Sequence, residues 1–282
     1  MAEVWGQSPQ GLALDPKREV ITMHDLHIHT TLSACCADPE AEPAGYLALA
    51  REQGLTAVGF VNHVWDSRIP GASPWYAPQT FERAMSIREQ IPADTFGIRV
   101  LVGVETEFAQ GVIALSPECA QQLDYVLVPH SHIHMEGLVR PAGVTASRDI
   151  ARFLADTFDD LVSRDFATIV AHPFCPLSFD SREQLPEIFS CLSDSRLEQS
   201  FGLAAEHGAG VEINLAIFRY GAEDPLYDDT YYRMFRIARK MGCRFSFGSD
   251  SHSLAELDRL SAQKRVGELL GLTEADLVSI AR

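Results

Sequence analysis

Short runs of apolar and β-branched residues recur along the chain, and polar or charged side chains follow each run closely. Runs of this length and composition predict buried β-strands. We expect seven of them: Glu19–Met23, Thr56–Val61, Arg99–Val104, Tyr125–Val128, Ala167–Ala171, Gly210–Asn214 and Cys243–Phe247.

Segments with apolar residues three or four positions apart separate these runs, and this spacing predicts amphipathic helices. The clearest is Ser147–Ser163. The others are Pro43–Gln53, Gln79–Gln90, Glu183–Ser190, Leu197–His207, Thr230–Met241, Leu254–Leu270 and Thr273–Ala281. Local signals agree: Gly54 suits a helix C′ position, Ser116-Pro117 begins a short helix, and Thr273-x-x-Asp276 resembles a capping box.

Strands that alternate with helices predict a parallel α/β fold. An open doubly wound sheet would concentrate its chemistry at one switch point, and no GxGxxG follows the first strand. Histidines and acidic residues instead follow the predicted strands all along the chain, and the carboxyl ends of the strands are where barrel enzymes place their catalytic residues. We therefore expect a distorted, TIM-like α/β barrel of seven strands. Residues 1–282 contain no linker or repeat, so we expect a single hydrolase domain.

Composition narrows the function classes. The chain is 46% hydrophobic and 22% charged, as in ordinary globular proteins, and its net charge is −16. Such a surface repels long nucleic acid but not a small phosphorylated metabolite, because bound divalent cations reverse the local field. No CxxC pair, signal peptide or run of about 18 apolar residues is present. We expect a cytoplasmic protein with reduced thiols and no membrane partner; oligomeric state is not indicated.

The candidate chemistry lies after the strands. In an extended chain residues two apart point to the same side, so His27 and His29 can present both imidazoles to one point. A single histidine at a strand end is more often a packing or surface residue, but here ligand-type residues recur at one end after another. The set is His27, His29, His63, Glu105, His132, His172, Asp250 and His252.

Nitrogen ligands with some carboxylate suit Zn²⁺, Mn²⁺ or Fe²⁺ better than Ca²⁺ or Mg²⁺. Eight ligands exceed the needs of one tetrahedral ion, so two or three ions are implied, with Glu105 as the natural bridge. Such a cluster lowers the pKa of bound water from 15.7 to about 7 in favourable zinc cases and neutralises a phosphate. The expected reaction is hydrolysis.

The same residues fall in motifs that resemble, in order, those of the PHP (polymerase and histidinol phosphatase) family, from about Met23 to His252. The motifs are His27-x-His29, Asn62-His63, Gly103-Val104-Glu105, His130–His134, Ala171-His172-Pro173 and Gly248–His252. The resemblance implies a distorted seven-stranded barrel with a di- or trinuclear centre for phosphoester hydrolysis. It implies one ion on His27, His29, Glu105 and Asp250, a second on Glu105, His132 and His172, and a third on His63 and His252.

Within the family, the segment from Glu212 to Arg219 resembles the histidinol-phosphatase branch. The resemblance therefore implies a metal-dependent phosphomonoesterase with L-histidinol phosphate as the leading substrate. Arg219 would clamp the phosphate, although a solvated surface arginine is the alternative. Asp250 and His252 are the candidate proton-relay residues.

Three departures from the family pattern leave alternatives open. Cys35 is either a thiolate ligand of the third ion or a buried apolar cysteine. The usual aspartate before the second-motif histidine is Asn62, and His130, His132 and His134 all alternate to one side, of which we choose His132.

Two other functions remain possible, namely hydrolysis of a nucleotide or other phosphodiester and a non-catalytic metal-binding module. An amidohydrolase ranks last because no lysine lies at a strand end.

Overall fold

Seven parallel strands form a nearly closed barrel in the computed structural model, which describes residues 21–166, 168–175, 184–218 and 225–282. The order along the sheet is β1-β2-β3-β6-β7-β8-β9. The two edges approach each other where Asp250 N donates to His27 O at 2.8 Å and His29 N donates to Ser251 O at 2.9 Å. The strands are β1 His24–Ile28, β2 Ala57–Val64, β3 Arg99–Thr106, β6 Tyr125–Pro129, β7 Ile169–Ala171, β8 Gly210–Asn214 and β9 Arg244–Gly248. The expected barrel is therefore confirmed.

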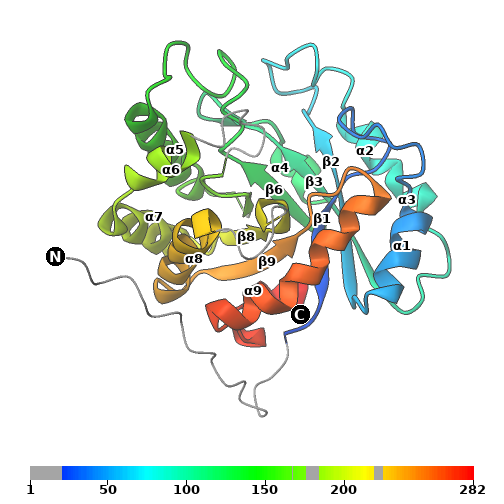
Figure 1. The fold of residues 1–282 in the computed structure, drawn as a ribbon. Helices are drawn as coiled ribbons and strands as arrows, with labels where there is room; N and C mark the ends of the chain where they lie inside the picture. Colours follow the sequence, from blue (N-terminus) through cyan, green and yellow to red (C-terminus); the bar gives the residue numbers. More distant parts are fainter. Residues whose placement is uncertain (1–20, 167, 176–183, 219–224) are drawn as a thin grey trace.

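Helices surround the barrel (Figure 1). On α5 the apolar side chains of Ile150, Leu154 and Phe158 are buried against the barrel, and Phe153 is partly buried. The α-helices are α1 Pro43–Glu52, α2 Phe81–Met85, α3 Ile87–Gln90, α4 Pro117–Ala120, α5 Ser147–Val162, α6 Gln184–Ser190, α7 Asp194–Glu206, α8 Pro225–Lys240 and α9 Gln263–Leu270. The 3-10 helices are η1 Leu215–Phe218, η2 Leu254–Ala262, η3 Glu274–Asp276 and η4 Ser279–Ala281. Within the described residues, no helix is long and apolar enough to cross a bilayer.

Tyr125 fills part of the barrel interior. Its buried hydroxyl donates to Leu26 O at 2.7 Å, across from β6 to β1. A Cβ at Gly59 would collide with this hydroxyl, and one at Gly103 would lie 2.8 Å from the Tyr125 carbonyl oxygen. Two glycines on neighbouring strands thus make room for one large side chain, as packing of a small barrel requires.

The first strand was predicted wrongly. It covers His24–Ile28, whereas Ile21–Met23 are not in a strand and Glu19 and Val20 lie outside the described residues. The strand contains buried polar side chains that the fold satisfies: Phe247 N donates to His24 Nε2 at 3.0 Å, and Ser249 N donates to Asp25 Oδ1 at 2.9 Å. A hydrophobicity pattern therefore points to the wrong residues here.

Two predicted helices are interrupted. Residues 79–90 divide into α2 and α3 at Ser86, whose hydroxyl donates to Arg83 O at 2.7 Å. Residues 273–281 form η3 and η4, because Val278 N donates to Phe245 O on β9 at 2.9 Å and leaves the helical pattern. Residues 254–262 are 3-10 helix rather than α-helix. The antiparallel hairpin of β4 Phe108–Ala109 and β5 Val112–Ile113 was not predicted.

The local end signals are confirmed. Gly54 follows α1 with φ of +74°, where an L side chain would be strained. Ser116 caps α4 by accepting from Cys119 N at 3.3 Å, and Pro117 is the first helical residue. Thr273 and Asp276 form the capping box.

Candidate metal centre

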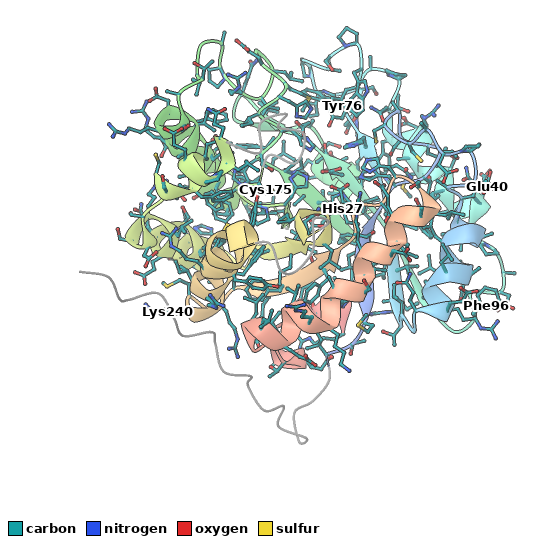
Figure 2. The ribbon with its side chains drawn as sticks, in the orientation of Figure 1. His27, Glu40, Tyr76, Phe96, Cys175 and Lys240 are labelled. Atoms are coloured by element: carbon teal, nitrogen blue, oxygen red, sulfur yellow. The ribbon has the colours of Figure 1, made fainter. Side chains whose placement is uncertain are left out.

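The carboxyl ends of the strands bring all eight candidate ligands to one end of the barrel, and His27 lies near the centre of the molecule (Figure 2). Together with Cys35 they form three groups, in each of which one potential donor atom per residue lies within 4.8 Å of the others, and His29 belongs to two of the groups. The groups are His27, His29 and Asp250; Glu105, His132 and His172; and His29, Cys35, His63 and His252.

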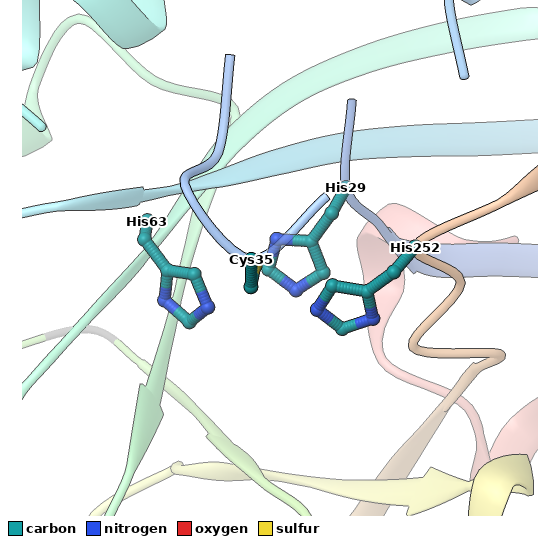
Figure 3. Close-up of side chains that lie close together, drawn as sticks. All are labelled: His29, Cys35, His63 and His252. Carbon is teal, nitrogen blue, oxygen red and sulfur yellow. The ribbon is translucent and has the colours of Figure 1, made fainter. Parts of the chain in front are cut away.

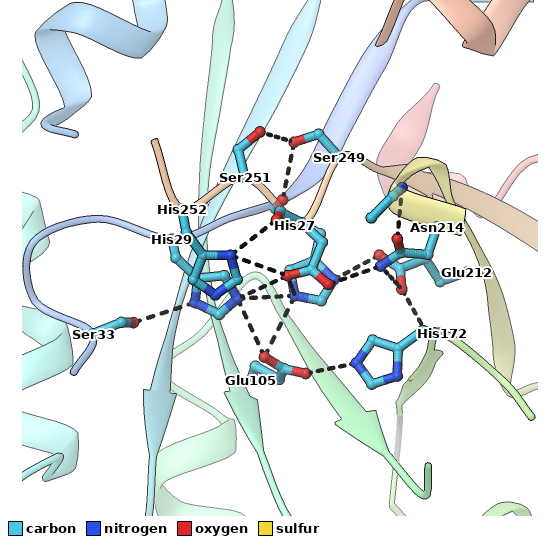
Figure 4. A network of polar contacts seen from close by, with 12 residues as sticks. His27, His29, Ser33, Glu105, His172, Glu212, Asn214, Ser249, Ser251 and His252 are labelled. Atoms are coloured by element: carbon cyan, nitrogen blue, oxygen red, sulfur yellow. Dashed lines mark hydrogen bonds and ion pairs between the residues drawn. The ribbon is translucent and has the colours of Figure 1, made fainter. Parts of the chain in front are cut away.

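Glu105, on β3, belongs to the group with His132 and His172 and also faces His27 and His29 (Figure 4). Its Oε2 is 3.4 Å from His27 Nε2 and 3.3 Å from His29 Nε2. Its Oε1 faces the other way, 3.2 Å from His172 Nε2 and 3.9 Å from His132 Nε2. The two oxygens of this one carboxylate thus face two different groups of ligands, the arrangement that a bridging ligand needs.

Hydrogen bonds at Nδ1 fix the tautomers of three histidines. His27 Nδ1 donates to Glu212 Oε1 at 2.7 Å, and His132 Nδ1 donates to Glu107 Oε1 at 2.7 Å. His172 Nδ1 lies 2.6 Å from Ser131 Oγ, whose own hydroxyl donates to His172 O, so the ring nitrogen is the donor. Each Nε2 is left with a free lone pair, which is the state of a metal-binding imidazole.

A relay of hydrogen bonds fixes His29 in the same way. Asn62 Oδ1 accepts from Thr30 N at 3.0 Å and from the Ser33 hydroxyl at 2.8 Å. Because the Ser33 hydroxyl already donates its proton to Asn62, its oxygen accepts a hydrogen bond from His29 Nδ1 at 3.2 Å. Asn62 thereby sets the tautomer of His29 through Ser33. His252 Nδ1 donates to Asp250 O at 3.0 Å, which orients a fifth ring.

These orientations leave the cluster in need of cations. The Nε2 atoms of His27 and His29 face each other at 3.1 Å, where two lone pairs, or two N–H groups, repel. Glu105, Glu107 and Glu212 are all buried, and within the described residues their ion pairs are with histidines. Divalent cations between the Nε2 atoms and the carboxylates would remove both problems, so the residues fit the expected metal ions.

The pKa shifts have the same origin. Burial alone would lower the pKa of His27, but the carboxylates of Glu212, Asp250 and Glu105 outweigh it and raise the pKa well above its usual range. Burial alone would raise the pKa of Glu105, but the surrounding histidines, led by His63, hold it well below its usual range. Neighbouring histidines, led by His27, also hold the pKa of Asp250 well below its usual range, so Glu105 and Asp250 remain charged and need positive charge beside them.

Two ligand-bearing turns have unusual backbones. His172, after β7, has φ of +29°, and Asp250, after β9, has φ of +54°. Non-glycine residues adopt this region rarely, and they do so mainly where surrounding contacts hold them there. Here Glu212 Oε2 accepts from His172 N at 2.7 Å, and His27 O accepts from Asp250 N at 2.8 Å. The turns aim both side chains back into the barrel mouth.

Sequence reasoning missed the supporting residues Glu107 and Glu212. Glu212 was noted only as part of a motif, yet it contacts both His27 Nδ1 and the backbone of His172. A Cβ at Gly248 would collide with Glu212 Oε1 and with His27 Cβ, so glycine is required beside this pair. One signal was available, because a carboxylate inside an apolar strand is buried only when it has partners.

The other residues singled out from the sequence have different outcomes in the structure. His130 turns into the core, where its Nε2 accepts from Phe174 N at 2.9 Å, and it belongs to none of the three groups. Cys35 is not buried, so the buried apolar alternative is wrong. Arg219 lies outside the described residues. In the long loop after β2, Tyr76 is buried, while Trp75 is exposed and contacts the ring of His63 edge-on at 5.1 Å.

Comparisons with known proteins agree with this fold. No family model matches the chain. Two curated relatives, probable phosphatases of Thermoanaerobacter sp. (strain X514) and Thermoanaerobacter pseudethanolicus (strain ATCC 33223 / 39E), are each 25% identical over 260 residues. Each match covers 90% of this chain and 88% of the relative.

Among solved structures, the histidinol phosphate phosphatase of Lactococcus lactis subsp. lactis Il1403, complexed with zinc, L-histidinol and phosphate, is similar. Its TM-score is 0.62 at 16% identity, over 90% of this chain and 95% of that one. At this identity the similarity shows the fold.

Proposed function

We propose that the chain is a metal-dependent phosphatase that hydrolyses a small phosphomonoester. The observation that carries the proposal is the position of Glu105, with one carboxylate oxygen near the Nε2 atoms of His27 and His29 and the other near that of His172. The names of the two curated relatives, both probable phosphatases, support the same reaction class.

Two or three divalent ions of zinc, manganese or iron would occupy the three groups of ligands. His27, His29, Glu105 and Asp250 would hold one ion, and Glu105, His132 and His172 a second. His63 and His252 belong to the third group. When bound, such ions polarise a phosphoryl oxygen and lower the pKa of water.

The chain's own residues supply orientation and proton transfer. Asp250 and His252 are proposed to relay protons, because their side chains are 12% and 31% exposed while those of His27 and His29 are fully buried. Arg219, which lies outside the described residues, is proposed to bind the phosphate.

L-Histidinol phosphate is the proposed substrate. The support is the motif from Glu212 to Arg219, together with fold-level analogy to the lactococcal enzyme.

The test measures phosphate release from L-histidinol phosphate, a nucleoside monophosphate and a simple phosphodiester, with Zn²⁺ or Mn²⁺ present. We expect histidinol phosphate to react fastest and His27→Ala to abolish the rate. His207→Ala, which changes an exposed histidine at the end of α7, is the matched control and should retain it.

Faster hydrolysis of the diester would replace the proposal with a phosphodiesterase. No hydrolysis of any ester by protein that holds its metal would indicate a non-catalytic metal-binding module.

A further inference from the structure

The third group of ligands contains a cysteine beside histidines. Cys35 lies between the rings of His63, His29 and His252 (Figure 3), and one potential donor atom of each of the four residues lies within 4.8 Å of the others. The ring of His29 stacks on both neighbours, with centroids 4.6 Å from that of His63 and 4.3 Å from that of His252. The sulfur therefore belongs to a compact set of nitrogen donors.

The turn that carries Cys35 is held on both sides. Ala34 N donates to the side-chain oxygen of Gln79, a buried residue, at 2.8 Å. Cys36 Sγ donates to His252 O at 3.0 Å, which ties the next residue to the turn after β9. Cys35 is thus placed by its two neighbours and is not a thiol on a free surface loop.

His29 is already committed to the first group. Its Nδ1 donates to Ser33 Oγ, so its one lone pair is on Nε2, which lies 3.3 Å from Glu105 Oε2 and 3.5 Å from Asp250 Oδ1. This leaves Cys35, His63 and His252 for a separate ion. His63 points to a ligand independently: its side chain is 7% exposed, and its buried Nδ1, which lies 3.3 Å from Glu105 Oε2, makes no hydrogen bond.

We propose that Cys35 is a thiolate ligand of the third ion, together with His63 and His252. The proposal rests on the metal centre of the proposed function but not on its substrate. One sulfur and two nitrogens form a softer set than the carboxylate-containing groups around Glu105 and Asp250. Thiolate ligands favour zinc and disfavour manganese and magnesium, so this site selects zinc-like ions whatever occupies the other two.

Cobalt reports the sulfur directly, because thiolate bonded to Co²⁺ gives a near-ultraviolet charge-transfer band that nitrogen and oxygen ligands do not give. Chelator-stripped protein is titrated with Co²⁺ alone, and metal content is then measured. We expect the band in the wild-type protein and in Cys191→Ser, which changes an exposed cysteine after α6. Cys35→Ser should lose the band and one bound ion per chain.

The affinity of the third site should fall at least about 100-fold in Cys35→Ser, since changes in outer-shell partners alone cost 10- to 100-fold. A wild-type protein without the band, or a Cys35→Ser variant that retains it, would overturn the proposal. Circular dichroism of the variant checks that the fold is intact.

Alkylation of the unmodified protein gives a second test that needs no variant. Iodoacetamide is applied with and without Zn²⁺, and fragment spectra separate Cys35 from Cys36. We expect Zn²⁺ to protect Cys35 while Cys191 reacts equally in both samples. Equal labelling of Cys35 in both samples contradicts the assignment. Neither readout involves phosphate release, so this assignment and the proposed phosphatase activity can fail separately.

Discussion

Replacing Glu212 with glutamine tests the support of the site without changing any candidate ligand. Glu212 accepts from His27 Nδ1 and from His172 N, both at 2.7 Å, with its two oxygens. Glutamine has nearly the same shape but only one oxygen, so its NH₂ group must face one of these donors. If it faces His27, the ring is driven to the tautomer that protonates Nε2, and the lone pair directed at Glu105 and Asp250 is lost.

The magnitude follows from burial. Glu212 is 1% exposed, and a buried donor left facing a donor costs about 1–3 kcal/mol. Loss of a partner behind a metal ligand lowers metal affinity about 10- to 100-fold, which is about 1.4–2.7 kcal/mol. We therefore expect Glu212→Gln to weaken Zn²⁺ binding by that factor and to lower the free energy of unfolding by about 1–3 kcal/mol.

Isothermal titration of Zn²⁺ into chelator-stripped protein and urea unfolding measure the two effects. Glu198→Gln is the matched control: it removes a carboxylate that pairs on the surface with Lys240, at 2.6 Å, and should change neither quantity by more than about 0.5 kcal/mol. A folded Glu212→Gln protein with wild-type Zn²⁺ affinity would refute the claim that Glu212 sets the His27 tautomer.

Three further perturbations have expected outcomes. Gly248→Ala should lower Zn²⁺ affinity and cost about 1–3 kcal/mol of stability, because the added Cβ would collide with His27 and Glu212. The control in the same titration and unfolding assays is Gly202→Ala on α7, where the added Cβ would meet only the flexible end of Met241 at 3.3 Å. Burial lowers the pKa of His24 from 6.5 to about 4, so the neutral form stabilises the fold above pH 6.5 and this contribution is lost as pH falls toward 4. Between about pH 7.5 and about pH 5.5, chelator-stripped wild type should lose about 1.3 kcal/mol more than His24→Gln in urea unfolding, and equal losses would contradict the assignment. Removing metal should lower the melting temperature, since an ion at 100 times its Kd contributes about 2.7 kcal/mol, and an unchanged melting temperature after Zn²⁺ is restored would contradict the metal centre.

Elements with a clean apolar pattern could be predicted from sequence. Ser147–Val162 buries the expected side, and the predicted strand Gly210–Asn214 has the observed bounds. The first strand could not, because His24 and Asp25 are buried through partners on β9 and beyond it, more than 200 positions away. Apolar periodicity indicates which hydrophobic side chains are buried, but it does not reveal buried polar side chains whose hydrogen-bond partners are distant in the sequence.

The candidate ligands were accessible to sequence reasoning for a simple reason. Parallel strands deliver their carboxyl ends to one place, so residues such as His27, Glu105 and Asp250 meet whenever the barrel closes. The residues behind them were not accessible, since nothing in the spacing of Glu212 or Glu107 names His27 or His132 as its partner. Side-chain pairing across 185 positions is set by the three-dimensional packing, including the space left by Gly248.

The central claim is that the barrel mouth holds metal ions that hydrolyse a phosphomonoester. The most direct measurement is the rate of phosphate release by chelator-stripped protein before and after Zn²⁺ or Mn²⁺ is restored, compared with Glu105→Gln. We expect no release from stripped protein, recovery on adding metal, and no recovery in Glu105→Gln. Equal rates with and without metal, or full recovery in Glu105→Gln, would contradict it.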